Sequence, residues 1–402
     1  MRDGRGGIDL CEAWTGATPL RLRATASGTR SSATRLRILP RPWMQRLDRL
    51  VGRLPVSVSV GGATGSLFGH GADIRRIPAS NEKLLLSMAL LDRFRPDTRI
   101  PTTAEARAPA HGVVHGNLWL VGHGDPEVGP STIERLAARV RAAGIRRIRG
   151  AVIGDTSTFS RERWAPGWRQ IALRFISIPT ALTFEGNAGP GGFVFDPERR
   201  AAAAFAADLR ALGVRVDGGS DAGPVAKRSQ TIAAVLSAPL IDVLRRQNTG
   251  SVNLDAEVLG KRLGAAVFGP PGTTAKGAAA IRRWAGRRGV NVVTLDASGL
   301  SYRNRITTTA MVRLLTIARR TWGDTLPSTL AAPGEGTLAG RLGGLAVRAK
   351  TGTLLDNVSA LSGYVRPADS NHWLAFSIMS RGLSKDRAVA IEDAVVRIAA
   401  GA

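Results

Sequence analysis

The chain has 402 residues, of which 44% are hydrophobic and 22% are charged, so it has room for one large or two to three ordinary domains, and a disordered protein is excluded. The net charge of +25 would suit a nucleic-acid binder, but the basic residues are scattered arginines and aromatic residues make up only 5%, so we expect no nucleic-acid partner. The charge reflects either a compositional bias or attraction to an anionic polymer such as cell wall.

Other site classes are also limited by composition. The single Cys11 allows neither an intramolecular disulfide nor a cysteine-based metal site, and the five histidines lack zinc-ligand spacing, so we expect no metal site. No apolar stretch is long enough for a transmembrane helix. Arginines interrupt every possible apolar core of a secretory signal in residues 1–42; they are Arg21, Arg23, Arg30, Arg35 and Arg37. We therefore interpret residues 1–42 as a disordered extension, or as the result of a start codon placed upstream of, or in place of, the true leader.

Ordered structure is expected from Trp43. Periodicity predicts a helix at 44–51, strands at 56–60 and 65–69, and a helix opening at Ser80 whose apolar residues from 84 to 91 lie on nearly all faces. That helix should be buried in the middle of its domain.

From 96 to 234 the pattern changes to short strands and helices, which predicts an inserted α/β module. Its predicted elements are strands at 117–121 and 151–153 and helices at 133–143 and 199–212. The first domain then resumes, giving a division into 43–95 with 235–402 and the insertion 96–234. The elements predicted after 234 are helices at 239–247, 254–264, 308–320 and 386–399 and paired strands at 345–351 and 359–365.

Lysine is rare in this chain. Lys and Arg together number 56, and only six are lysines. A lysine beside Ser or Thr therefore suggests a requirement that arginine cannot meet, because an ammonium can lose its proton when desolvated and a guanidinium cannot.

Ser80 and Lys83 are the first such pair. Residues three apart share a helix face, so Lys83 is positioned to take the hydroxyl proton of Ser80, and the helix N-terminus provides N–H groups for an oxyanion. The structural alternative is that Ser80 only caps the helix and Lys83 lies on the surface. The Ser-x-x-Lys pattern alone is weak evidence for a catalytic pair.

Two further motifs follow, Ser251-Val252-Asn253 and Lys350-Thr351-Gly352-Thr353. Each alone reads as a helix cap or a strand end followed by a turn. The three together, in this order, are the signature of serine β-lactamases and penicillin-binding proteins.

At this point the chain resembles the D-alanyl-D-alanine carboxypeptidase/endopeptidase family, the class C low-molecular-mass penicillin-binding proteins. The resemblance covers about 43–395 and includes the segments 77–84, 116–126, 154–159 and 296–301. It implies an α+β fold of the penicillin-binding transpeptidase or β-lactamase type, with an antiparallel sheet flanked by helices and interrupted by a smaller α/β module.

The resemblance implies that the reaction needs no cofactor and no metal, and it also implies roles for the motif residues. Ser80 would be the nucleophile, Lys83 its base, and Ser251 the proton relay to the leaving group. Asn253 would position the substrate amide, and Lys350 would stabilise charge and help to hold Lys83 neutral. Thr351 and Thr353, flanking Gly352, would bind the terminal carboxylate, and the N–H groups of Ser80 and Thr353 would form the oxyanion hole.

The implied substrates are peptidoglycan peptides, with β-lactams as acylating ligands, and the implied location is periplasm or cell wall. Two departures from the family are visible. The segment 183–187 is followed almost directly by the segment 193–200, so we expect that the further domain usual within this insertion is missing. In addition, no signal peptide is recognisable. A β-lactamase or esterase on the same fold, or a non-catalytic wall-binding homologue, stays open as an alternative. The balance of carboxypeptidase and endopeptidase activity, the stem-peptide preference and the oligomeric state are not encoded in any motif.

Overall fold

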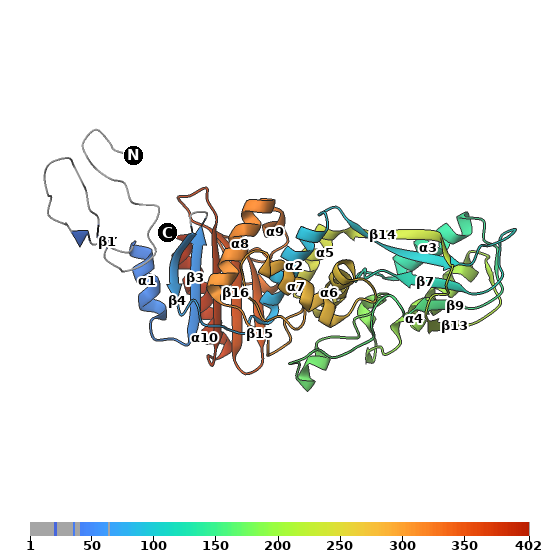
Figure 1. The fold of residues 1–402 in the computed structure, drawn as a ribbon, viewed down its shortest axis with the longest axis horizontal. Coiled ribbons are helices and arrows are strands. Elements are labelled where there is room, and N and C mark those ends of the chain that lie inside the picture. The colour runs from blue at the N-terminus through green and yellow to red at the C-terminus, as the bar shows by residue number, and fades with distance from the viewer. Residues whose placement is uncertain (1–19, 22–34, 37–40, 63–64, 402) are drawn as a thin grey trace.

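The computed structural model describes residues 20–21, 35–36, 41–62 and 65–401. Cys11 and most of the predicted extension 1–42 lie outside these residues, and the interpretation of that segment stays a prediction. Helix α1 (Pro42–Val51) is the first helix of the described residues, and it has a proline in its first turn, where no N–H is needed. Figure 1 shows an elongated molecule in which one large sheet lies near the C-terminus and a second sheet lies at the far end.

The larger sheet is wholly antiparallel, in the order β15-β16-β17-β3-β4. One face packs against α1 and α10 (Lys385–Ala400), and the other packs against helices of the molecule's centre. The predicted fold of an antiparallel sheet flanked by helices is therefore confirmed. Its strands are β15 (Ala346–Leu354), β16 (Val358–Arg366), β17 (Leu374–Arg381), β3 (Val56–Gly62) and β4 (Gly65–His70).

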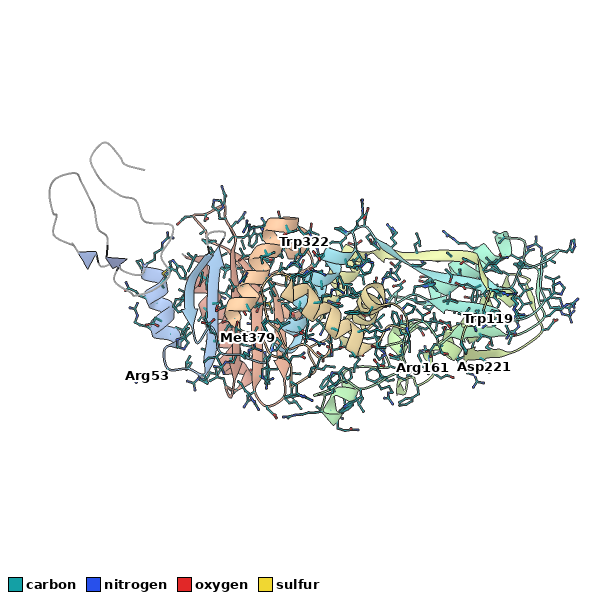
Figure 2. All side chains as sticks on the ribbon, in the orientation of Figure 1. Arg53, Trp119, Arg161, Asp221, Trp322 and Met379 are labelled. Carbon is teal, nitrogen blue, oxygen red and sulfur yellow. The ribbon has the colours of Figure 1, made fainter. Side chains whose placement is uncertain are left out.

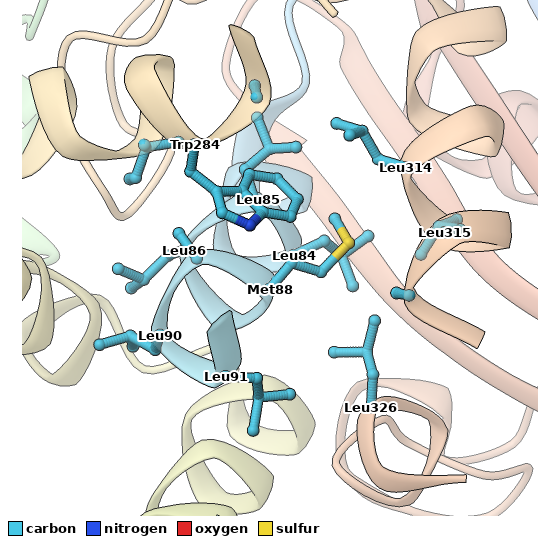
Figure 3. Close-up of a cluster of buried hydrophobic side chains, with 14 of the residues drawn as sticks. Leu84, Leu85, Leu86, Met88, Leu90, Leu91, Trp284, Leu314, Leu315 and Leu326 are labelled. Atoms are coloured by element: carbon cyan, nitrogen blue, oxygen red, sulfur yellow. The ribbon is translucent and has the colours of Figure 1, made fainter. Parts of the chain in front are cut away.

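Helix α2 (Glu82–Arg93) forms the centre of the molecule, as its apolar faces predict. Every residue from Glu82 to Leu91 is buried. Figure 3 shows its leucines and Met88 in one cluster with Trp284 of one neighbouring helix and Leu314 and Leu315 of another. Removing one such leucine side chain costs about 2–5 kcal/mol, so the helix is held firmly where it carries the candidate site. Its neighbours are α5 (Leu240–Gly250), α6 (Asn253–Phe268), α7 (Thr274–Gly286), α8 (Thr308–Trp322) and α9 (Thr325–Ser328).

The second sheet is built entirely from residues between 99 and 239, in the order β13-β9-β7-β5-β14. Strands β7, β9 and β13 run parallel, joined by crossovers that contain α3 (Pro130–Ala142) and α4 (Pro197–Ala211), and these helices close a separate hydrophobic core. The chain enters through β5 (Arg99–Ala106) and leaves through β14 (Gln230–Pro239), which pair side by side. The other strands are β7 (Leu118–Gly122), β9 (Val152–Asp155) and β13 (Ser220–Gly223).

A short hairpin precedes α4 in the chain. Strand β10 (Ala188–Gly189) pairs with β11 (Gly192–Phe193), so only two residues join them. The remaining short elements are β1 (Leu20–Arg21), β2 (Arg35–Leu36), β6 (Val113–Val114), β8 (Arg147–Ile148), β12 (Arg215–Val216), η1 (Ala79–Asn81), η2 (Gln170–Arg174), η3 (Glu185–Asn187) and η4 (Gly336–Leu338). Figure 2 shows side chains along both sheets and the helices between them.

Candidate active site

Ser80 lies in η1, a one-turn 3-10 helix immediately before α2. Ala79 has a φ of 48°, a strained value for a residue with a side chain, and this turn brings the chain sharply into the helix. Ser80 is half-buried, whereas Lys83 one turn later is fully buried. The nucleophile candidate is therefore accessible, and its partner is shielded from water.

Lys83 has three close polar neighbours. Its Nζ lies 3.1 Å from Ser80 Oγ, 2.8 Å from Asn253 Oδ1 and 2.7 Å from the Ser298 carbonyl oxygen. The last two atoms can only accept hydrogen bonds. A neutral Lys83 amine that donates its two hydrogens to them presents its lone pair to the hydroxyl of Ser80, the arrangement that a general base requires.

Burial lowers the pKa of Lys83 from 10.5 to about 8, because the interior disfavours its ammonium form. Four carboxyl groups oppose the shift by favouring the charged form. They are Asp296, Glu257, Asp255 and Glu82. Lys83 therefore loses its proton far more readily than an exposed lysine does, and a substantial neutral fraction exists at mildly alkaline pH.

Asn253 reaches Lys83 because of the sharp turn before it. Ser251 ends α5 in the left-handed conformation, with a φ of 55°, and Asn253 begins α6. The amide oxygen of Asn253 then faces Lys83, and its amide nitrogen donates to the Phe175 carbonyl at 3.1 Å. The Ser251 hydroxyl has no hydrogen-bond partner among the described residues, so it does not contact Ser80 or Lys83 directly.

Strand β15 brings the third motif against the nucleophile turn. A Cβ added at Gly352 would lie 2.8 Å from the Pro78 carbonyl oxygen and 3.2 Å from the Ala79 Cβ, so glycine permits this approach. Lys350 is fully buried and donates to the Thr351 carbonyl at 2.9 Å. In the described part of the chain the hydroxyls of Thr351 and Thr353 have no hydrogen-bond partner, and Thr353 is exposed. Both hydroxyls are free to bind a ligand.

The role expected of Lys350, holding Lys83 neutral, stays a prediction. Burial, followed by repulsion from Lys83, lowers the pKa of Lys350 well below its usual value. Among the described residues no carboxylate opposes this shift at Lys350, whereas four do so at Lys83. Burial is the largest cause of the lowered pKa of Lys83.

The profile of the D-Ala-D-Ala carboxypeptidase 3 (S13) family matches residues 54–190 and 189–402, which is most of the sequence. The chain belongs to this family. The two matched segments meet at residues 189–190, within the short hairpin of β10 and β11.

Known proteins agree with this membership. A D-alanyl-D-alanine carboxypeptidase from an Actinomadura species is 30% identical over 444 residues, covering 87% of this chain and 82% of that protein. Carboxypeptidase DacB of Mycolicibacterium smegmatis is 30% identical over 362 residues, covering 81% and 76%. Penicillin-binding protein 4 (dacB) of Haemophilus influenzae, also crystallised with a β-lactam, shares the fold with a TM-score of 0.73 and 22% identity, over 84% of this chain and 94% of that one.

Two functional contacts in this carboxypeptidase have no counterpart in the motif-based site assignment. Asn81 is fully buried, and the hydrogen-bond pattern places its amide nitrogen 2.8 Å from the Lys350 carbonyl and its oxygen 2.7 Å from Ser362 Oγ. It therefore joins the nucleophile turn to β15 and β16. The second contact is the hydrogen bond between Lys83 Nζ and the Ser298 carbonyl oxygen. Its acceptor is a backbone atom, so no side-chain motif in the sequence predicts it.

The loop that carries this carbonyl is held by Asp296. Its carboxylate accepts hydrogen bonds from the N–H groups of Gly299 and Ser301, from the Asn304 amide and from the Trp168 indole. These four hydrogen bonds hold the loop of residues 296–301 in one conformation.

A cavity of about 410 Å³ lies beside Asn253, between the inserted module and the start of α6. Its charged walls are internally paired: Arg246 binds Asp255 at 2.8 Å and also contacts Glu127. The described residues hold no cluster of three or more His, Cys, Asp or Glu suited to a metal ion. They also include no helix of the length and apolarity that a membrane crossing demands.

Proposed function

We propose that this family member is a penicillin-binding serine peptidase that cleaves the D-Ala-D-Ala end of peptidoglycan stem peptides through an acyl-enzyme on Ser80. The observation that carries the proposal is the position of Lys83 Nζ, 3.1 Å from Ser80 Oγ and flanked by two carbonyl acceptors. The family's D-Ala-D-Ala carboxypeptidase activity supports the choice of substrate.

In acylation, the Ser80 oxygen attacks the carbonyl carbon of the penultimate D-Ala while its proton moves to Lys83 Nζ. We assign stabilisation of the resulting oxyanion to the backbone N–H groups of Ser80 and Thr353. The C–N bond then breaks as the leaving D-Ala nitrogen takes up the proton from Lys83. We assign the relay of that proton to the Ser251 hydroxyl, which has to move within reach of Lys83 because the two are not in direct contact. Water subsequently attacks the ester, Lys83 takes the proton of that water, and Ser80 recovers its proton as the acid product leaves.

In substrate binding, the free hydroxyls of Thr351 and Thr353 suit the terminal carboxylate. The amide nitrogen of Asn253 carries two hydrogens, of which one donates to the Phe175 carbonyl, and the other suits the peptide carbonyl of the substrate. A carboxylate near Lys350 would favour its ammonium form, so the charge that stabilises the ligand would appear as the ligand binds.

The site of action that we propose is outside the cytoplasm, in periplasm or cell wall, because the polymer substrate lies there. β-Lactams are proposed as acylating ligands of Ser80, since they present a reactive carbonyl and a carboxylate. The net charge of +25 favours contact with an anionic wall polymer.

The test is the intact mass of the protein after incubation with penicillin. We expect one stable adduct in the wild type and none in Ser80→Ala, with release of D-Ala from a D-Ala-D-Ala peptide lost in the same variant. Rapid loss of the adduct with penicillin turnover would support a β-lactamase or esterase. A folded wild type that never forms an adduct would support a non-catalytic wall-binding protein.

A further inference from the structure

Helix α6 presents two side chains on one face toward the candidate site. Asn253 and Glu257 are four residues apart, so they lie one above the other. Asn253 contacts Lys83 directly. Glu257 is 1% exposed, and its Oε1 accepts hydrogen bonds from the N–H groups of Ala297 at 2.9 Å and Ser298 at 2.7 Å. Glu257 therefore holds the backbone of the loop whose next carbonyl receives Lys83.

That carbonyl is fixed from both sides. The Ser298 carbonyl belongs to the same peptide group as the Gly299 N–H, which donates to Asp296 Oδ1 at 3.2 Å, and the two groups point in opposite directions. Glu257 fixes the preceding two N–H groups. Together, the two carboxylates aim the Ser298 oxygen at Lys83 Nζ, 2.7 Å away.

We propose that Glu257 is a positioning residue for the reaction: it fixes the Ser298 carbonyl as a hydrogen-bond acceptor for Lys83, and so aims the amine lone pair at Ser80. The inference rests on the proposed function, because it assigns Lys83 the role of base. Glu257 touches neither the nucleophile nor a substrate. It acts through the 297–298 backbone.

The charge of Glu257 gives a second effect that separates this role from simple packing. Its carboxylate favours the ammonium form of Lys83, as do Asp296 of the loop, Glu82 of α2 and Asp255 of α6, while Lys350 of β15 opposes that form when it is charged. The charged groups that face Glu257 itself are Lys83, Asp296, Lys261 and Glu82. Burial raises the pKa of Glu257 to about 7, which is below the value of about 8 for Lys83, so the carboxylate is mostly ionised where Lys83 titrates.

Two substitutions separate geometry from charge. Glu257→Gln keeps an oxygen that can accept from both N–H groups but removes the charge. Glu257→Ala removes both. Glu162→Gln is the matched control, because Glu162 also accepts a backbone N–H, that of Thr274 at 2.6 Å, without contacting the candidate site.

The experiment measures the penicillin acylation rate against pH, with thermal melting to verify folding. For Glu257→Gln we expect a rate within about threefold of wild type at its optimum, and an acid limb moved to lower pH by about half a unit, because a charge that favours the ammonium is lost. For Glu257→Ala we expect a loss of more than about tenfold that Gln rescues. The control should match wild type in both rate and acid limb.

Equal rates in wild type and Glu257→Ala, or an unmoved acid limb in Glu257→Gln, would overturn the positioning role. If Glu257→Ala does not fold, the pH profile of Glu257→Gln still decides. Failure of the proposed function looks different, because the wild type itself would then show no adduct at Ser80.

Discussion

Asn253 Oδ1 accepts a hydrogen bond from Lys83 Nζ at 2.8 Å, although the two residues stand 170 positions apart in the chain. The inserted sheet of residues 99–239 lies between them in sequence. Lys83 therefore gains this acceptor only when the chain leaves the insertion through β14 and places α5 and α6 against α2. The insertion and the candidate site are structurally linked even where the module contributes no catalytic group.

The contact predicts the effect of Asn253→Asp. The change places a carboxylate beside Lys83 Nζ, which favours the ammonium and raises the pKa of Lys83 above about 8. The acid limb of penicillin acylation should move to higher pH, and the rate at pH 7 should fall by more than about tenfold. Asn117→Asp is the control, since its oxygen can still accept from the Ala151 N–H at 2.9 Å, far from the site. An unmoved acid limb in Asn253→Asp would mean that Lys83 does not set the pH dependence.

Lys83 offers a test of proton transfer against charge alone. Arginine keeps a positive charge but does not deprotonate in proteins, so Lys83→Arg should acylate at below about 1% of the wild-type rate, as should Lys83→Met. The measurement is labelling by a fluorescent penicillin in variants whose thermal melts show a folded protein. Retention of more than about a tenth of the rate in Lys83→Arg would show that the site needs only a cation.

Lys350 predicts proton uptake on ligand binding. Its pKa is well below the usual value in the ligand-free protein, and a bound carboxylate should raise it. A D-Ala-D-Ala peptide binding to Ser80→Ala should therefore take up a proton at pH values between the pKa of Lys350 in the free protein and its pKa in the complex. Calorimetry in two buffers of different ionisation enthalpy measures this uptake directly.

The control for that uptake is Ser80→Ala combined with Lys350→Met, in which it should disappear. Proton uptake that persists in the double variant would show that a group other than Lys350 takes up the proton. No uptake in Ser80→Ala would mean that Lys350 is already charged before the peptide binds.

Much of this arrangement is predictable from sequence where apolar periodicity governs the chain. The helix predicted at 308–320 is α8 (Thr308–Trp322), and the strands predicted at 345–351 and 359–365 are β15 and β16, each slightly longer. Helix α7 and strand β17 were not predicted. In α7 the two glycines of the sequence TAKGAAAIRRWAG lower its helix propensity, which weakens the helix signal.

The candidate site divides in the same way. The motifs name the side chains that the structure brings together, Ser80 with Lys83 and Asn253, since side-chain type is visible in a sequence. The Ser298 carbonyl is not, because every residue has one. The sequence also does not predict the burial of Glu82 and Glu257. A charged residue within a helix usually lies on its solvent face, whereas both of these residues are 1% exposed here.

Gly299 supplies the last prediction. Its φ is 87°, and an added Cβ would lie 1.9 Å from the Ala79 carbonyl oxygen and 3.0 Å from the Ser80 nitrogen. Gly299→Ala must therefore displace either the nucleophile turn or the loop that carries the Ser298 carbonyl. A shift of about 1 Å in a reacting group can cost about 100-fold, so acylation should fall at least that far, with a destabilisation of about 1–3 kcal/mol from backbone strain.

Gly286→Ala is the matched control for that substitution, because a Cβ at Gly286, the last residue of α7, would meet no atom within 4 Å. It should leave the acylation rate unchanged and the melting temperature equal or slightly higher, since alanine favours helix more than glycine does. Acylation at the wild-type rate in a folded Gly299→Ala protein would show that the loop and the nucleophile turn can separate without consequence. The Ser298 carbonyl would then not be required to hold Lys83 in place.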